Sequence, residues 1–180
     1  MFGFFSKRSD QRAKTRASVP TVKFDPKQLT KAIRADLSAR INEFEDLPEG
    51  KQAQIFDAAV VMAEPGRDLS YLASALINLG VPKGRASYIA LYLANRSTAL
   101  MNVARMRDNG LSEGKWLYSG APCYATNAPT IAELAIDEAH RTANGRRFLL
   151  DKGLKLHSVW TFPGLEPGCK CVTIAVVPGF

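Results

Sequence analysis

The feature that most constrains the fold is a change in the apolar pattern near residue 110. Before it, apolar side chains recur every three or four residues, which is the period of one face of an α-helix. After it, short apolar runs alternate with Pro, Gly and Asn turn residues, as is typical of short strands. With 180 residues, 46% hydrophobic and 23% charged, the composition is that of a globular protein and excludes wholesale disorder. The sequence therefore predicts an α+β fold.

Four helices are expected in the first part of the chain. The first follows Asp25-Pro26, a capping residue and a proline at the first helical position, and runs to about Asp46. The second ends at Pro65-Gly66, and the third runs from Asp68 to Gly80. The fourth and longest extends from about residue 82 to 109. The first apolar face illustrates the periodicity and consists of Leu29, Ile33, Leu37, Ile41 and Phe44.

The second part of the chain is expected to form a small, turn-rich β lobe with one helix. Apolar runs predict strands at 116–118, 155–162 and 171–177, and a helical pattern covers residues 131–140. Three regions follow from these patterns: a flexible basic N-terminal arm at 1–24, a helical region at 25–110 and the α+β lobe at 111–180.

Positive charge is concentrated in the N-terminal arm and the residues just after it. Residues 1–34 hold nine Lys or Arg and two Asp, a net charge of +7 that equals the charge of the whole chain, so the other 146 residues are neutral. Such an arm suits contact with phosphates or with an acidic protein surface. A solvated tail is the alternative. The candidate residues for DNA or partner binding are Lys7, Arg8, Arg12, Lys14, Arg16 and Lys23.

All cysteines and histidines lie in the last 58 residues. Zn²⁺ prefers thiolate and imidazole ligands, and a closed four-ligand site is structural. Three cysteines and one histidine form a candidate Cys3His zinc site: Cys123, His140, Cys169 and Cys171. The alternative is that the cysteines are small buried hydrophobes and that His140 complements the dipole at a helix end. His157 is expected to be a bystander, and Glu166 is a possible substitute ligand. Three cysteines form no complete set of disulfides, which favours a reducing compartment.

The sequence lacks the motifs that several classes of enzyme require. The chain has no phosphate-binding glycine loop, no dinucleotide fingerprint and no H-E-x-x-H zinc motif. A hydrolase triad would have to combine Asp137 and His140 with Ser119 or Cys123, and no motif places these residues together. No run of 18 apolar residues predicts a membrane span. We therefore expect a protein that is not an enzyme and does not enter a membrane.

The order of motifs in the second half resembles a known family. Residues 106–110 (Met-Arg-Asp-Asn-Gly) end a long helix, and Trp116-x2-Ser119 and a cysteine follow. Next come His140-x4-Gly145-x2-Phe148 and finally Glu-Pro-Gly-Cys-Lys-Cys at 166–171. This order is similar to that of the phage Mu F-type minor head proteins, also called phage head morphogenesis proteins, over about residues 85–177. Glu166 stands where that family usually has His, and Lys170 replaces an Arg.

The resemblance implies a low-copy structural protein of a tailed-phage or prophage head. Such a protein would associate with the portal and the major capsid protein, lie inside the head or at the portal vertex, and pass through the host cytoplasm during assembly. Residues 25–110 would then be a helical docking region, and the basic arm would contact DNA. Two other functions remain open: a zinc-stabilised nucleic-acid-binding protein without a virion role, and an effector or transferase-like enzyme.

Overall fold

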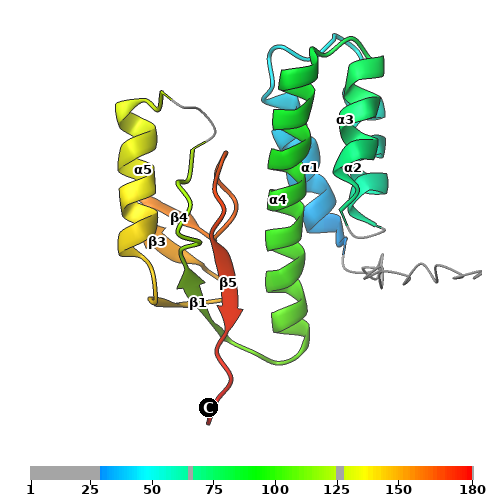
Figure 1. Cartoon of the computed structure of the whole chain (residues 1–180). Helices are drawn as coiled ribbons and strands as arrows, with labels where there is room; N and C mark the ends of the chain where they lie inside the picture. Colours follow the sequence, from blue (N-terminus) through cyan, green and yellow to red (C-terminus); the bar gives the residue numbers. More distant parts are fainter. Residues whose placement is uncertain (1–28, 65–66, 125–127, 180) are drawn as a thin grey trace, which may run out of the picture.

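The computed structural model describes residues 29–64, 67–124 and 128–179. Within these ranges the protein is α+β, as the sequence predicts, with five helices and two small antiparallel sheets (Figure 1). The N-terminal arm lies outside the described residues, together with its candidate binding residues Lys7, Arg8, Arg12, Lys14, Arg16 and Lys23. No helix in the described ranges combines the length and the apolar character needed to cross a membrane.

The helical half contains α1 (Lys31–Asn42), α2 (Gln52–Ala63), α3 (Leu69–Asn78) and α4 (Lys83–Asp108). The side chain of Thr30 accepts a hydrogen bond from Ile33 N and caps α1, and Asp68 caps α3 in the same way. The start predicted at Asp25-Pro26 lies outside the described residues, and the helix itself begins only after Thr30. It also ends earlier than the predicted Asp46, because the backbone of residues 43–50 forms turns.

The β lobe combines a three-stranded sheet, a hairpin and a helix. Strands β1 (Glu113–Leu117), β2 (Arg147–Leu149) and β5 (Val172–Ala175) form the antiparallel order β2-β1-β5. Strands β3 (Leu154–Leu156) and β4 (Val159–Thr161) form the hairpin, and α5 (Ile131–Thr142) begins with a capping box between Thr130 and Glu133. The single strand predicted over 155–162 is wrong, because the chain turns at His157, whose φ is +46°. Strand β2 was not predicted.

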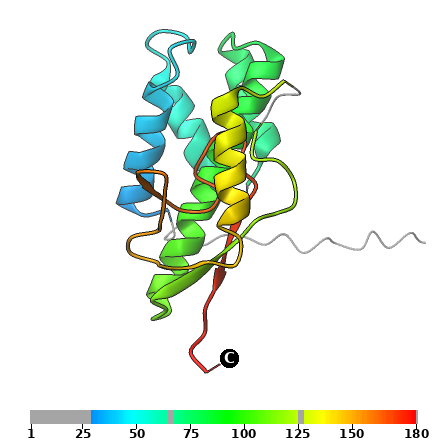
Figure 2. The ribbon, with the colours of Figure 1, turned by 90° about the vertical axis from the view of Figure 1, so that its left-hand side faces the viewer.

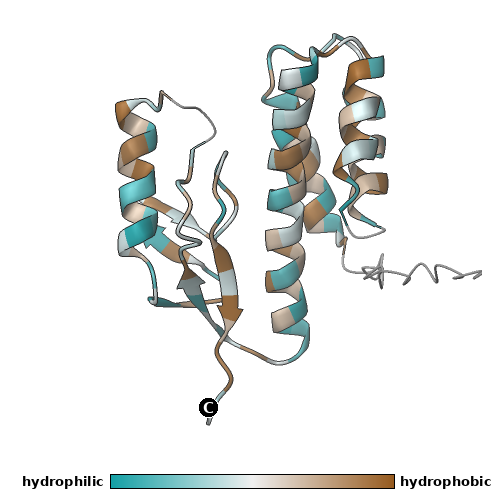
Figure 3. Cartoon of the chain, in the orientation of Figure 1, coloured by the Kyte–Doolittle hydropathy of each residue, from teal (hydrophilic) through white to brown (hydrophobic). Residues whose placement is uncertain are grey.

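Two separate hydrophobic clusters stabilise the two halves. The helical cluster lies between α1, α2, α3 and α4, and its fully buried members include Leu37, Ile55, Leu72, Ile89 and Leu93. The lobe cluster surrounds Trp116 and includes Phe148 and all three cysteines. Val103 of α4 belongs to the lobe cluster, so the long helix contributes to both cores. Figure 3 shows hydrophobic and hydrophilic residues alternating along α4 and α5.

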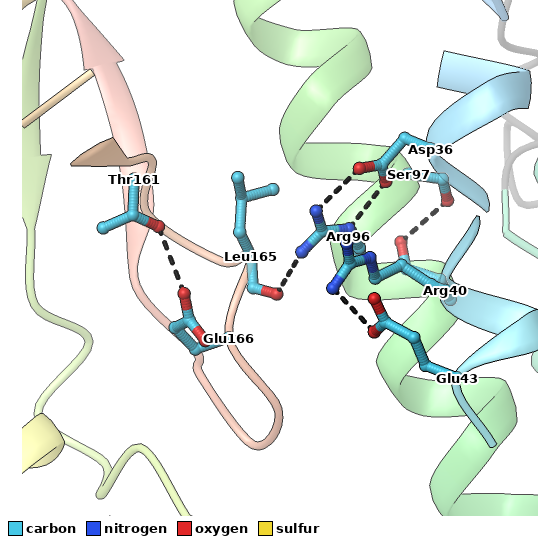
Figure 4. A network of polar contacts seen from close by, with 9 residues as sticks. Asp36, Arg40, Glu43, Arg96, Ser97, Thr161, Leu165 and Glu166 are labelled. Atoms are coloured by element: carbon cyan, nitrogen blue, oxygen red, sulfur yellow. Dashed lines mark hydrogen bonds and ion pairs between the residues drawn. The ribbon is translucent and has the colours of Figure 1, made fainter. Parts of the chain in front are cut away.

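The lobe packs beside α4 with β5 as the adjacent strand and α5 on the outer side (Figure 1); in Figure 2, viewed from the lobe, α5 lies in front of α4. Arg96 of α4 joins three parts of the chain (Figure 4). Its guanidinium donates to both carboxylate oxygens of Asp36 in α1 at 2.6 and 2.7 Å, and to the carbonyl oxygen of Leu165 in the lobe at 2.8 Å. Both charged side chains are largely buried, so this ion pair helps to fix the lobe against the bundle.

Candidate metal centre

Four side chains that can bind a metal meet at the centre of the β lobe. Cys123 comes from the loop after β1, His140 from the last turn of α5, and Cys169 and Cys171 from the segment that leads into β5. Each residue is at most 3% exposed. Their ligand atoms all lie within 4.8 Å of one another. The structure thus brings together all four ligands that the sequence predicts, close enough to hold a metal ion.

The measured distances describe a compact set of three sulfurs and one nitrogen. Cys123 Sγ lies 3.7 Å from Cys169 Sγ and 3.5 Å from Cys171 Sγ. His140 directs Nδ1 toward the same point, 3.4 Å from Cys169 Sγ and 4.0 Å from Cys171 Sγ. No disulfide joins the cysteines. All four atoms therefore converge on one small volume.

The lobe core fixes the orientation of His140. Its ring packs against the fully buried Trp116, with 5.0 Å between ring centroids, and the ring of Phe148 lies edge-on to Trp116 with 6.4 Å between centroids. The capping box at the start of α5 fixes the beginning of the helix that carries His140. An imidazole held between an indole and three sulfurs loses little further freedom when it binds a metal.

Polar contacts from Asp137 and Lys170 hold the loop that carries Cys123. Asp137 of α5 accepts hydrogen bonds from Cys123 N at 2.7 Å and from the Tyr118 hydroxyl at 2.9 Å. Lys170 Nζ donates to the carbonyl oxygen of Pro122 at 2.9 Å. These contacts connect the Cys123 loop to the helix of His140 and to the Cys169–Cys171 segment, so the three ligand-bearing segments are joined outside the ligand set itself.

Hydrogen bonds among the thiols separate their pKa values. Hydrogen bonding with Cys169 and then with Cys171 holds the pKa of Cys123 well below its usual range. The same contacts to Cys123 raise the pKa of Cys169 above its usual range and that of Cys171 to about 11. Three thiolates packed this closely would repel one another, and a bound cation relieves that repulsion. The three sulfurs and the imidazole nitrogen therefore lie close enough together to hold a metal ion.

The structure places the other candidate residues outside this set. His157 is exposed at the β3–β4 turn, which agrees with the expectation that it is a bystander. Glu166 accepts a 3.4 Å hydrogen bond from Thr161 and does not belong to the ligand group. The sequence interpretation missed the role of Asp137, whose position one helical turn before His140 was the only local signal.

Four buried protein ligands would complete the coordination of a tetrahedral ion, and closed sites of this kind are structural. Comparison of the chain with protein families, with curated proteins and with solved structures finds no match.

Proposed function

We propose that the metal is zinc and that it is structural. A tetrahedral zinc ion with Zn–S bonds of about 2.3 Å and a Zn–N bond of about 2.05 Å requires S···S separations of about 3.8 Å and S···N separations of about 3.6 Å. Four of the six separations in the lobe are 3.5 and 3.7 Å between sulfurs and 3.4 and 4.0 Å from sulfur to nitrogen, and the other two are at most 4.8 Å. The donor set supports the same ion, because thiolate with imidazole selects zinc over Mg²⁺ or Ca²⁺.

Zinc would give the lobe stability that its strands do not supply. Strands β2, β3 and β4 have three residues each, and the lobe core is small. The ion would bind segments that are separated by 17 residues from Cys123 to His140 and by 29 from His140 to Cys169. Fixing distant segments through a metal makes the binding free energy part of the folding free energy.

We also propose that the chain is a minor head protein of a tailed phage or prophage, an assembly component without catalytic activity. One observation carries this proposal: the motif residues of the family resemblance form a single structural unit. Trp116, Phe148, His140 and the three cysteines come from four separate motifs, and they are buried together around one centre. Short motifs that meet in one core support the resemblance more strongly than their order along the chain does. The proposed partners are the portal and the major capsid protein, with DNA at the basic arm.

The departure at Glu166 is compatible with this proposal. The family's terminal motif usually has His at that position, whereas Glu166 here contacts Thr161, and the four-ligand set is complete without it. Loss of that histidine therefore leaves this chain with a full tetrahedral ligand set.

The zinc proposal is tested by elemental analysis of the full chain purified without chelator. We expect about one zinc per chain, lost in the double variant Cys169→Ser, Cys171→Ser. The matched control is His157→Gln, which changes the exposed histidine and should keep the metal. A folded wild-type chain free of zinc, or equal zinc in the double variant, contradicts the proposal.

The virion proposal is tested by proteomics of phage-like particles banded by density. We expect the chain at low copy number in the same fraction as portal and capsid subunits. As a control, an abundant cytosolic protein of the host should be absent from that fraction. Absence of the chain from portal-containing particles and from their assembly intermediates contradicts the virion role and leaves the zinc proposal intact.

A further inference from the structure

A groove of about 480 Å³ runs along α4 on the side that faces the lobe. One wall is a stripe of α4 with helical spacing: Leu91, Asn95, Thr98, Asn102 and Arg105. The opposite wall is the segment from Cys169 to Val172, with Pro163 and Gly164 beside it. From Leu91 to Arg105 the α4 stripe rises through 14 residue steps, which at 1.5 Å per residue is about 21 Å. We call this feature the α4 groove.

Two arginines of the α4 groove are held in the same unusual way. Arg105 Nη2 donates to Asn102 Oδ1 at 2.7 Å, and Asn102 Nδ2 donates to the carbonyl oxygen of Thr173 at 3.2 Å. Arg67 donates likewise to Asn95 Oδ1, and Asn95 Nδ2 donates to the carbonyl oxygen of Cys169 at 3.4 Å. The two asparagines are seven residues apart, two turns along one face of α4, so each orients one arginine at the groove.

Four of the ten arginines in the part of the chain that the structure describes form no ion pair there: Arg67 and Arg105 at the groove, and Arg107 and Arg146 outside it. Six other arginines form ion pairs with carboxylates: Arg34, Arg40, Arg85, Arg96, Arg141 and Arg147. Arg67 and Arg105 instead hydrogen-bond to neutral amides, which leave the positive charge of the guanidinium uncompensated. Lys170 adds a third cation, and no acidic residue is among those that line the groove. The groove therefore presents positive charge without a carboxylate in its lining.

The rest of the lining is mostly apolar. Leu91 and Val172 are 42% and 48% exposed, and Ala99 also lines the groove. No aromatic ring is among the lining residues, although sites for single-stranded nucleic acid usually stack bases on aromatic side chains. The ligand that matches this surface carries both carboxylates and apolar side chains.

We propose that the α4 groove binds an extended segment of a partner protein in which acidic side chains flank apolar ones. The carboxylates would contact Arg67, Arg105 and Lys170, and the apolar side chains would cover Leu91 and Val172. The length of the α4 stripe, about 21 Å, matches about six residues of extended chain. The N-terminal arm of the same chain is excluded by its positive charge. This inference does not depend on the virion role, because it rests on the chemistry of the groove.

The test uses the full zinc-loaded chain and fluorescently labelled peptide pools. One pool has Asp or Glu at alternating positions with Leu or Val between them. A second pool has the same acidic positions with Ser between them, and a third replaces the acids with Lys. A single-stranded oligodeoxynucleotide is the fourth probe. Fluorescence anisotropy measures binding, and sedimentation velocity of the chain alone measures self-association.

We expect binding of the first pool only. The triple variant Arg67→Gln, Arg105→Gln, Lys170→Gln should weaken it by at least about tenfold. The matched control removes three exposed charges outside the groove: Arg107→Gln, Arg146→Gln, Lys152→Gln. This control should bind like the wild type. The variant Val172→Lys adds a positive charge but removes an apolar contact, and it should also weaken binding by about tenfold.

Four results would overturn the proposal. The first is equal binding by the two triple variants, which would show a response to net charge alone. The second is stronger binding by Val172→Lys, or preference for the oligonucleotide, which would identify a phosphate ligand. The third is absence of binding by any pool to a folded wild-type chain. The fourth is self-association abolished by the groove variants, which would make a second copy of the chain the occupant.

Discussion

The backbone N–H of Cys123 donates a 2.7 Å hydrogen bond to the carboxylate of Asp137. Asp137 and His140 are three residues apart on α5, so one face of this helix both supplies a candidate metal ligand and positions the loop of another. The same carboxylate oxygen also accepts the Tyr118 hydroxyl at 2.9 Å. The geometry of the candidate metal centre therefore depends on a residue outside the candidate ligand set.

Changing Asp137→Asn should weaken zinc binding by about tenfold, the lower end of the range for residues that orient metal ligands. The amide keeps the shape of the side chain but loses the negative charge that strengthens both hydrogen bonds. Competition with a chromophoric chelator measures the affinity. Glu138→Gln, on the exposed face of the same helix, is the control and should bind zinc as the wild type does. Equal affinities of the two variants would contradict a positioning role.

The Tyr118 hydroxyl gives a prediction about alkaline stability. Burial, followed by the hydrogen bond to Asp137, raises the pKa of Tyr118 from 10.0 to about 12. The folded state thus holds this proton more tightly than the unfolded state does, so its contribution to stability is complete below pH 10 and is lost between about pH 10 and 12. The free energy of unfolding should fall more steeply across that window in wild type than in Tyr118→Phe. Parallel slopes would show that the phenol does not contribute.

Removal of the metal by a chelator should unfold the lobe and leave the helical half folded. The two halves have separate hydrophobic clusters, and the four candidate ligands all belong to the lobe. We expect the near-ultraviolet circular dichroism of Trp116 to disappear while most of the far-ultraviolet helical signal persists. Re-addition of zinc should restore the first signal. A single cooperative loss of both signals would show that the halves do not fold separately.

The ion pair between Arg96 and Asp36 should contribute more to stability than a similar pair on the surface. Asp36→Asn leaves the largely buried Arg96 without its carboxylate (Figure 4), and should lower the free energy of unfolding by about 2 kcal/mol. Asp46→Asn makes the same change in the exposed pair with Arg85 and should cost less than about 1 kcal/mol. Urea denaturation of both variants measures the difference, and equal losses would contradict the role of burial.

Gly114 in β1 occupies a position where a side chain has no room. A Cβ atom there would lie 2.7 Å from Thr173 Cγ2 and 3.0 Å from Leu150 Cδ2. Gly114→Ala should therefore lower the free energy of unfolding by about 1–3 kcal/mol. Gly84→Ala in α4 is the control, because a Cβ there meets nothing within 4 Å and alanine favours the helix. Thermal unfolding compares the two, and equal midpoints would show that the lobe accommodates the methyl group.

The elements that follow a regular pattern could be predicted from the sequence. The helical half shows the 3.6-residue period over long stretches, and β1, α5 and β5 lie within a few residues of their predicted places. The hairpin of β3 and β4 was missed because the turn contains His157 at positive φ, where Asn or Gly is usual. Strand β2 has only three residues, and it is fixed by pairing with β1 rather than by its own residues.

The candidate ligands could be predicted because the chain has only three cysteines and two histidines, and all of them lie in the lobe. The roles of Asp137 and of Asn95 and Asn102 could not be predicted. Asn95 contacts a carbonyl oxygen 74 residues away, and Asn102 one 71 residues away. No local sequence pattern predicts a hydrogen bond between residues this far apart in the chain, because such contacts depend on how the lobe packs against α4.

Helix α4 takes part in both cores and is connected to β1 by only four residues, 109–112. Its 26 residues form a rigid rod of about 39 Å, so the lobe follows any rotation of the helix. Inserting or deleting a single residue between Arg96 and Val103 would turn everything beyond that point by about 100°. We therefore expect length variation among natural versions of this protein to spare that stretch and to collect in the loops.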